Sequence, residues 1–366
     1  MHSRYFKLIP LLAAALLAGA PWHAHAQGKV AGLVANAGVG DALNRPALMV
    51  RDPAKAFLLG LTRAGKRLVA VGERGVIVLS DDDGRSWRQA SVPVSVTLTA
   101  VRFSSAQQGW AVGHSGVVLH SADGGATWSR QLDGVQAARL ALQSAEARPD
   151  DIIKLGEAQR LVKDGADKPL LGLHFSDDLH GIVVGAYNLA FQTADGGKTW
   201  TPLLERLDNP KAFHLYAVAA DANIMYIAGE QGTLLRSVDG GRNFERLASP
   251  YKGSLFGVAL LPSGDVVLAG LRGNAYRSAD RGVSWTRLEG VPPVSFTSVA
   301  STGAGNAMLA SQSGHLYSSD AGSNALRLLP GPALPPLHDA CLLPDGVIVA
   351  VSMFGAIRIP ATRGSL

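Results

Sequence analysis

The octet SADGGATW, Ser121–Trp128, recurs along the chain and decides its fold. Close copies are SDDDGRSW from Ser80, TADGGKTW from Thr193, SVDGGRNF from Ser237 and SADRGVSW from Ser278, and a degenerate copy, SSDAGSN, begins at Ser318. The copies start 41, 72, 44, 41 and 40 residues apart. Four of these intervals match one four-stranded blade of a β-propeller, and the long interval holds one blade plus an insertion of about 31 residues.

Each repeat is divided into short strands by turns that contain glycine. In the second repeat, the runs Leu98–Phe103, Trp110–Gly113, Val117–His120 and Thr127–Ser129 are separated by such turns. Short apolar or alternating runs bounded by glycine predict β-strands. We therefore expect four strands in a blade, A to D from the axis outward, with the octet as the turn between C and D.

The repeats predict an all-β, seven-bladed propeller over residues 45–360. Six blades carry an octet, and Val347–Ser352 with Ala356–Pro360 indicates a seventh blade that lacks both the octet and an outer strand. We expect Pro46–Val50 to supply that strand, because a shared blade would close the ring and remove its open edges. Six or eight blades remain alternatives if one end is misread.

The octet is an Asp box, and its residue types suit a tight turn. The aspartate can accept hydrogen bonds from backbone N–H groups, the glycines tolerate positive φ, and the aromatic ring can pack between blades. We expect a structural role, in preference to a role as acids or metal ligands, for Asp82, Asp123, Asp195, Asp239, Asp280, Trp87, Trp128, Trp200 and Trp285.

The first 26 residues have the pattern of a secretory signal peptide. Arg4 and Lys7 precede the apolar run Leu8–Ala20, and Ala24-His25-Ala26 forms a small-x-small cleavage site. A membrane anchor is the alternative, but the run is short for a bilayer. We expect cleavage before Gln27, residence in the periplasm, a lead-in over 27–44 and a tail over 361–366. The mature chain would carry a formal charge of +3 without a basic run, which disfavours nucleic acid as a partner.

Residues 131–168, after the second octet, form an insertion in which 134–164 predicts a helical hairpin. Asp150 or Asp151 could cap the second helix, and Gly165 could end it. One face of that helix would be apolar, through Ile152, Leu155, Leu161 and Val162. We expect the hairpin to lie over the ring, where it would cover the central channel or dock a partner.

Strand order places the B–C turns and the D–A links on the face opposite the Asp boxes. The residues of these turns vary while the glycines around them mostly recur, as expected of a variable binding surface on a rigid scaffold. The candidate partner-binding residues are Glu73, Arg74, His114, Tyr187, His214, Glu230, Gln231, Lys252, Arg272, Gln312, Phe354, His338 and Asp339. Phe256 and Phe296, from D–A links, are expected in the core.

Tandem Asp boxes after a Gly-x-x-Gly turn and an apolar strand resemble the photosystem II stability/assembly factor family and its relatives in non-photosynthetic bacteria. Gly113–Trp128 carries the resemblance best, while blade three departs from it with Gly185-Ala186-Tyr187-Asn188. The resemblance implies an exported, non-enzymatic, seven-bladed propeller that helps to assemble a membrane or envelope complex. The partner would be a protein of that complex, a transporter being one option, and we expect the scaffold to be monomeric.

A sialidase-like or other Asp-box glycoside hydrolase is the alternative function. Sialidases hold a carboxylate with three arginines beside a tyrosine and a glutamate, because arginine binds carboxylates bidentately. The B–C turns contain residues of these types, namely Arg74, Arg272, Glu73, Glu230 and Tyr187, but they contain no third arginine. No His/Cys/Asp cluster has metal-ligand spacing. We therefore expect neither catalytic residues, nor a metal, nor another cofactor.

Overall fold

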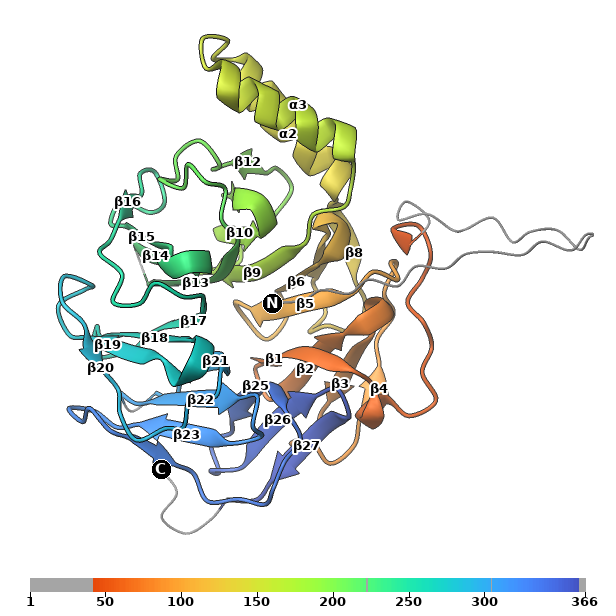
Figure 1. Cartoon of the computed structure of the whole chain (residues 1–366). Helices are drawn as coiled ribbons and strands as arrows, with labels where there is room; N and C mark the ends of the chain where they lie inside the picture. Colours follow the sequence, from red (N-terminus) through yellow and green to blue (C-terminus); the bar gives the residue numbers. More distant parts are fainter. Residues whose placement is uncertain (1–41, 222, 304, 362–366) are drawn as a thin grey trace, which may run out of the picture. The chain divides into compact units, whose positions relative to one another are not determined.

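The computed structural model describes residues 42–361 except 222 and 304, and these residues form a ring of antiparallel sheets (Figure 1). The sheets number seven, each with strands in consecutive order; six have four strands and the last has three. The predicted seven-bladed propeller is therefore confirmed. The predicted signal peptide and most of the lead-in and tail lie outside the described residues.

The first three blades contain β1 (Leu58–Ala64), β2 (Arg67–Gly72), β3 (Ile77–Ser80), β4 (Arg88–Gln89), β5 (Leu98–Phe103), β6 (Gly109–Gly113), β7 (Val118–Ser121), β8 (Ser129–Leu132), β9 (Leu170–Phe175), β10 (Gly181–Gly185), β11 (Ala190–Thr193) and β12 (Thr201–Pro202). The next two contain β13 (Leu215–Asp221), β14 (Ile224–Gly229), β15 (Leu234–Ser237), β16 (Glu245–Arg246), β17 (Leu255–Leu260), β18 (Val266–Gly270), β19 (Ala275–Ser278) and β20 (Thr286–Arg287). The last two contain β21 (Phe296–Ser301), β22 (Ala307–Ser311), β23 (Leu316–Ser319), β24 (Leu326–Leu328), β25 (Leu337–Leu342), β26 (Ile348–Ser352) and β27 (Gly355–Ile359).

The core lies between neighbouring blades. The second strand of a blade is packed on both sides, so strands such as β6, β18 and β22 are apolar without alternation and buried throughout. Trp110 in β6 is fully buried and stacks on Phe175 of the next blade, with 3.7 Å between ring centroids. Such large aromatic contacts between blades stabilise the ring.

The ring closes by packing between the first and last blades. The backbone N–H of Leu61 donates to Asp339 Oδ2 at 3.0 Å, and His338 Nδ1 lies 2.6 Å from the carbonyl oxygen of Leu58. Arg358 Nε donates to the carbonyl of Asp83 at 3.1 Å. The first and last blades are thus joined by side-chain hydrogen bonds and apolar packing rather than by a shared sheet.

The prediction that Pro46–Val50 completes the last blade is wrong. The segment lies along the outside of the first blade, where the N–H of Ala47 donates to Val92 O at 3.0 Å and that of Val50 to Gln89 Oε1 at 3.0 Å. The N–H of Leu48 also donates to the Arg74 carbonyl at 3.1 Å, so the segment bonds to groups of the first blade and of the link after β4.

Two helices, α2 (Gly134–Glu146) and α3 (Ile152–Asp164), form the predicted hairpin. Asp133 caps α2 by accepting from the N–H groups of Val135 and Gln136, and the Gln136 side chain accepts from the Asp133 N–H in return. Of the two candidate caps for α3, Asp151 accepts from Lys154 N, and Gly165 ends the helix as expected. Capping boxes of this kind fix where a helix begins.

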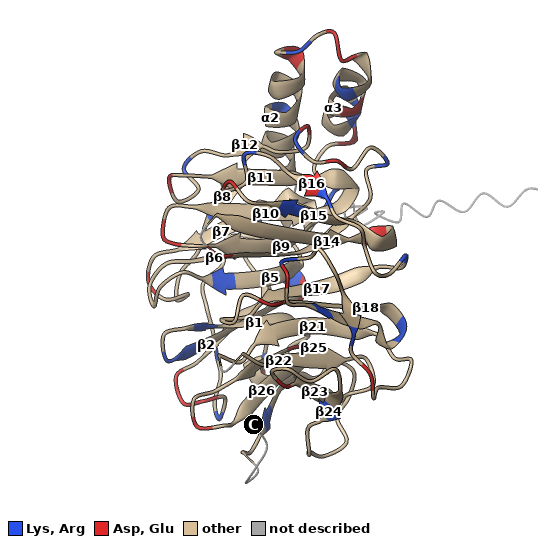
Figure 2. Cartoon of the chain, turned by 90° about the vertical axis from the view of Figure 1, so that its left-hand side faces the viewer, with Lys and Arg blue, Asp and Glu red and all other residues tan. Residues whose placement is uncertain are grey.

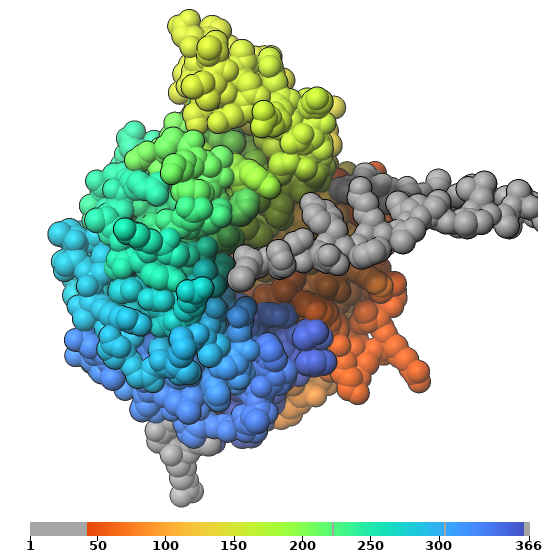
Figure 3. Space-filling model, viewed as in Figure 1, coloured from red at the N-terminus to blue at the C-terminus, as the bar shows by residue number. Residues whose placement is uncertain are grey.

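The hairpin lies outside the ring and not over its channel (Figures 1 and 3). It starts at the end of the outermost strand β8 and packs beside β12, the outermost strand of the third blade. A hairpin attached at the rim therefore cannot cover the axis. The expected apolar face is also not a single buried stripe, because Ile152 is 76% exposed and Val162 40% exposed, while Leu161 packs against the core.

No helix in the described part of the chain is long and apolar enough to cross a membrane.

Candidate partner-binding face

The Asp boxes use their carboxylates inside their own turns. Asp123 Oδ1 accepts from the Thr127 N–H at 3.0 Å, Oδ2 accepts from the Thr127 hydroxyl at 2.6 Å, and the Ser121 hydroxyl donates to Oδ1 at 2.8 Å. Ser121 Oγ in turn accepts from the Gly125 N–H at 2.8 Å. Corresponding bonds recur at Asp82, Asp195, Asp239 and Asp280.

These hydrogen bonds hold the carboxylates ionised. The pKa of the aspartate falls to about 2 in each of the five boxes. At three of them the largest cause is a hydrogen bond from a hydroxyl side chain: Ser86 donates to Asp82, Thr199 to Asp195 and Ser284 to Asp280. At Asp239 the largest cause is the Asn243 N–H. At Asp123 burial raises the pKa, but the bonds from Thr127 and Ser121 outweigh it. A carboxylate whose acceptors are occupied in this way is poorly placed to transfer a proton.

The box tryptophans differ in depth. Trp128 and Trp200 are 7% and 6% exposed, and the Trp128 indole donates to the Gly125 carbonyl at 2.9 Å. Trp87 and Trp285 are half-buried and pack at the edges of the interblade clusters. Among the described residues, no group of three His, Cys, Asp or Glu side chains could hold a metal ion.

The opposite face carries one backbone turn repeated in five consecutive blades. The B–C turns are the short 3₁₀ segments η2 (Glu73–Gly75), η3 (His114–Gly116), η4 (Ala186–Asn188), η5 (Glu230–Gly232) and η6 (Leu271–Gly273). The middle residue is left-handed in every one, with φ of 54° at Arg74, 59° at Ser115, 54° at Tyr187, 50° at Gln231 and 56° at Arg272. Non-glycine residues seldom adopt this conformation, so the turn is imposed by the blade. All but Ser115 are exposed to solvent.

Three of the predicted residues meet at the third and fourth blades. The Tyr187 N–H donates to His214 Nδ1 at 3.0 Å, the two rings contact edge-on with centroids 4.7 Å apart, and the His214 N–H donates to Glu230 Oε2 at 3.2 Å. Tyr216 continues the contact, 6.2 Å from His214 and 5.1 Å from Phe256 between ring centroids. We call Tyr187, His214, Tyr216 and Phe256 the aromatic row.

The aromatic row runs from the B–C turn of blade 3 to the first strand of blade 5, beside the channel. Burial, together with the charge of Glu230, raises the pKa of the Tyr216 hydroxyl, so that group stays a neutral donor. Phe256, expected in the core, is half-buried at the channel wall, whereas Phe296 is in the core at 1% exposed. Sequence reasoning did not single out the row, because its members come from different blades.

The other predicted residues are spread around the ring. Exposed positions on other blades or links are Glu73, Arg74, His114, Lys252, Arg272, Gln312 and Phe354. His338 is half-buried and stacks on Phe57, 5.3 Å between centroids. The B–C face is therefore a set of separated side chains with one continuous cluster, the aromatic row.

Asp339 lies inside the channel and not on the face. Burial raises the pKa of its carboxyl, although the Leu61 and Ala340 N–H groups donate to it. A cavity of about 560 Å³ on the Asp-box side of the channel also meets Arg102 and His174. Burial, with the charge of Arg102, lowers the pKa of His174 to about 4, and burial raises that of the half-buried Cys341 to about 11.

The arginines considered for a sialidase-like site do not converge. Arg74 belongs to blade 1 and Arg272 to blade 5, which are not neighbours in the ring. Arg63 and Arg102 line the channel instead of the face. A carboxylate clamp requires guanidinium groups that point at one ligand, and the described arginines of the B–C turns do not provide one.

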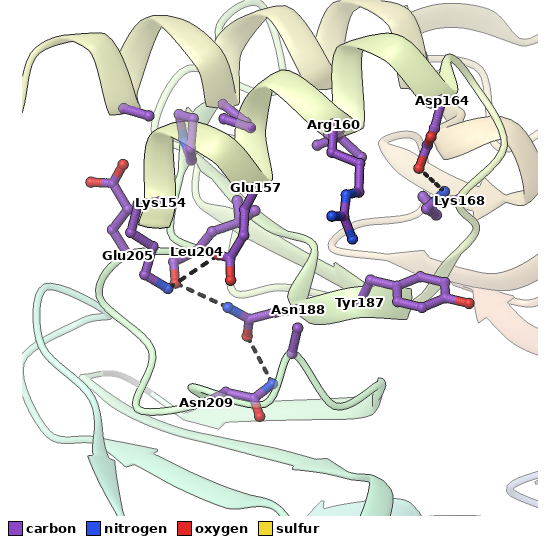
Figure 4. Close-up of a pocket in the computed structure, with 16 residues that line it drawn as sticks. Lys154, Glu157, Arg160, Asp164, Lys168, Tyr187, Asn188, Leu204, Glu205 and Asn209 are labelled. Atoms are coloured by element: carbon purple, nitrogen blue, oxygen red, sulfur yellow. Dashed lines mark hydrogen bonds and ion pairs between the residues drawn. The ribbon is translucent and has the colours of Figure 1, made fainter. Parts of the chain in front are cut away.

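A cleft that the sequence did not predict lies between the hairpin and blade 3 (Figure 4). Its volume is about 380 Å³. At its base, Asn188 Nδ2 donates to the Leu204 carbonyl at 3.0 Å, and Asn188 Oδ1 accepts from Asn209 Nδ2 at 2.9 Å. Asn188 stands where the other four turns have glycine, and this departure, together with the insertion that precedes blade 3, distinguished the blade in the sequence.

A protein-family model described as "Photosynthesis system II assembly factor YCF48" matches residues 79–164 and 156–325. A photosystem II assembly lipoprotein, Ycf48 of Synechococcus sp. (strain CC9902), is 35% identical over 77 residues, which are 21% of this chain and 23% of that protein. The match thus spans under a quarter of that relative's length.

Solved structures show the same fold at low identity. A structure titled "YCF48 bound to D1 peptide" has a TM-score of 0.60 at 17% identity and covers 87% of this chain and 99% of its own. YCF48 from Cyanidioschyzon merolae has a TM-score of 0.62 at 15% identity and covers 87% of this chain and 98% of its own. A streptogramin B lyase gives 0.63 at 12% identity, covering 88% and 99%, so fold similarity alone does not separate scaffold from enzyme.

Proposed function

The chain belongs to the family of the photosynthesis system II assembly factor YCF48, and on that premise we propose that it is an exported scaffold for assembly of a membrane or envelope complex. It would bind a segment of one protein of that complex on its B–C face. The observation that carries this proposal is the turn repeated in five blades, which presents exposed Arg74, Tyr187, Gln231 and Arg272 from four of them, together with the aromatic row that begins at Tyr187.

The chemistry of the face suits a protein partner. Tyrosine, histidine and arginine offer flat, amphipathic or multiply donating groups that contribute strongly to protein interfaces. On the side of the molecule drawn in Figure 2, basic and acidic residues are intermixed instead of forming a region of one sign. That distribution does not favour a polyanion such as nucleic acid.

Export to the periplasm is part of the proposal and rests on two observations. Residues 1–26 have the charge, apolar run and small-residue site of a signal peptide. The Synechococcus relative is named a lipoprotein, which is a property of exported proteins in bacteria. We propose that the partner is a membrane-embedded protein, a transporter being one option, and that the scaffold acts as a monomer.

The test is capture of a partner from envelope membranes. The chain from Gln27, tagged, is cross-linked to host membranes and compared with an Arg74→Glu/Arg272→Glu variant. Both arginines are exposed in B–C turns, so we expect the charge reversal to reduce capture and leave the thermal unfolding midpoint unchanged.

The matched control reverses two exposed charges on the Asp-box face, Lys198→Glu/Arg242→Glu. This control should capture the same membrane protein as the wild type. Equal capture by all three proteins would place the interface elsewhere, and loss of capture in the control alone would place it on the Asp-box face.

A further inference from the structure

We propose that the cleft between the helical hairpin and blade 3 binds an acidic, apolar peptide segment, with an aliphatic side chain on its alanine floor and a carboxylate at Arg160. This inference rests on the proposed function and assigns part of the partner's recognition to a second site. The site is formed by the hairpin, and the hairpin is an insertion between two blades.

The floor of the cleft is made by small side chains. Ala141 and Ala145 of α2 and Ala158 of α3 are 5%, 3% and 7% exposed, and Leu204 lies across from them. Methyl groups at these positions leave open the space that larger side chains would fill. A cavity of about 380 Å³ is at the lower end of the range for small-ligand sites and can hold a branched aliphatic side chain.

Most charges that line the cleft are already paired. Lys154 Nζ lies 3.6 Å from Glu157, Lys168 Nζ lies 3.1 Å from Asp164, and Glu205 contacts Arg148. Within each pair the two charges neutralise each other, so these residues do not require a charged group of the ligand.

Arg160 is different from the other charged residues of the cleft. It extends from α3 toward Tyr187 and Asn188 (Figure 4), and no hydrogen bond or ion pair joins it to another described residue. A guanidinium group presents a planar fork of donors that matches a carboxylate. Beside an apolar floor, it favours a ligand that carries an acidic group next to an aliphatic one.

The walls of the cleft are fixed before a ligand arrives. Asn188 and Asn209 are 4% and 2% exposed and hydrogen-bonded to each other, and Lys168 Nζ lies 5.3 Å from the centre of the Tyr187 ring. A prearranged site loses less conformational entropy on binding.

The cleft also continues the B–C face, because Tyr187 both lines the cleft and begins the aromatic row. An extended chain lying on the row can therefore place one end beside the hairpin. This continuity favours a peptide segment as the occupant over a free small molecule.

The experiment is a selection from a display library of randomised peptides against the chain from Gln27, followed by fluorescence polarisation with the enriched peptides. We expect enriched sequences with Asp or Glu beside Leu, Ile or Val. Arg160→Glu should weaken their binding at least tenfold. Arg139→Glu, an exposed arginine of the same hairpin outside the cleft, should change it by less than twofold.

A second variant, Ala158→Phe, fills the cleft without changing charge and should weaken the same peptides. Unchanged thermal midpoints would show that each variant is folded. The inference is overturned if no acidic, apolar sequence is enriched, or if enriched peptides bind Arg160→Glu as they bind the wild type.

Capture of the membrane partner distinguishes failure of this inference from failure of the proposed function. If Arg160→Glu captures the membrane partner as the wild type does while Arg74→Glu/Arg272→Glu does not, the B–C face stands and the cleft is excluded. If both variants lose capture and the peptides depend on Arg160, the cleft is part of the interface.

Discussion

On one face of the ring, the Asp-box turns share both their side chains and their backbone conformation. On the other face, the B–C turns share the backbone conformation, while the exposed side chains differ. At the Asp boxes the carboxylate of Asp123 and its counterparts bind groups of their own turn. At the B–C turns the left-handed residue is arginine, serine, tyrosine or glutamine, and most of these side chains reach solvent. Side chains that hydrogen-bond within their own turn cannot be replaced without loss of stability. Side chains that extend from a turn into solvent can vary and can contact a partner.

The largest effect should come from the core that both faces share. Trp110→Ala removes a fully buried ring that stacks on Phe175, and we expect it to lower the free energy of unfolding by about 3–5 kcal/mol. Urea denaturation measures this change. A midpoint equal to that of the wild type would contradict the packing between blades 2 and 3.

A smaller effect should come from an Asp box. Asp123→Asn should lower the free energy of unfolding near neutral pH by about 1 kcal/mol. This value is at the low end of what a hydrogen bond to a charged group contributes, because the carboxylate is exposed to solvent. The pKa of Asp123 is depressed to about 2, so its ionised form stabilises the folded chain above the unfolded pKa, near 4.

That contribution is lost as the pH falls from about 4 toward 2. Denaturation series at pH 7, 4 and 2 should therefore show the gap between wild type and Asp123→Asn narrowing with acid. A gap that stays constant would mean that the charge of Asp123 does not stabilise the turn.

The smallest effect on stability should come from the B–C face. Tyr187 is 56% exposed, so Tyr187→Ala should change the free energy of unfolding by less than about 0.5 kcal/mol while reducing partner capture. Val283→Ala, at a 75% exposed apolar residue of the Asp box in blade 5 on the opposite face, is the control and should leave both unchanged. Equal loss of capture in the two variants would show that the row is not a distinct site.

The sequence predicted features that depend on residues close together in the chain. Ser121, Asp123 and Gly125 form their turn within five positions, so the octet revealed six of the blades, and short apolar runs near the C-terminus indicated the seventh. Asp151 and Gly165 likewise mark the ends of α3. Predictions that depended on distant partners failed: Pro46–Val50 lies on the first blade, and the hairpin lies outside the ring.

The candidate site shows the same division. Tyr187, His214 and Glu230 were predicted one by one from their positions in turns and links, but their contacts with one another follow from the packing of blades 3 and 4. The cleft at Arg160 was not predicted, since it needs the hairpin to pack beside β12. Asp339 was predicted on the face, but its side chain meets the first blade inside the channel.

The sequence by itself therefore determined the repeat, the Asp-box turns, the helix ends and the resemblance to the assembly-factor family, because each depends on local hydrogen bonding or on a recurring pattern. Tertiary structure alone decided how the ring closes, where the hairpin lies and which exposed side chains are neighbours. The physical reason is that contacts between blades join residues tens to hundreds of positions apart, as Leu61 and Asp339 show, and no local pattern encodes such a pairing.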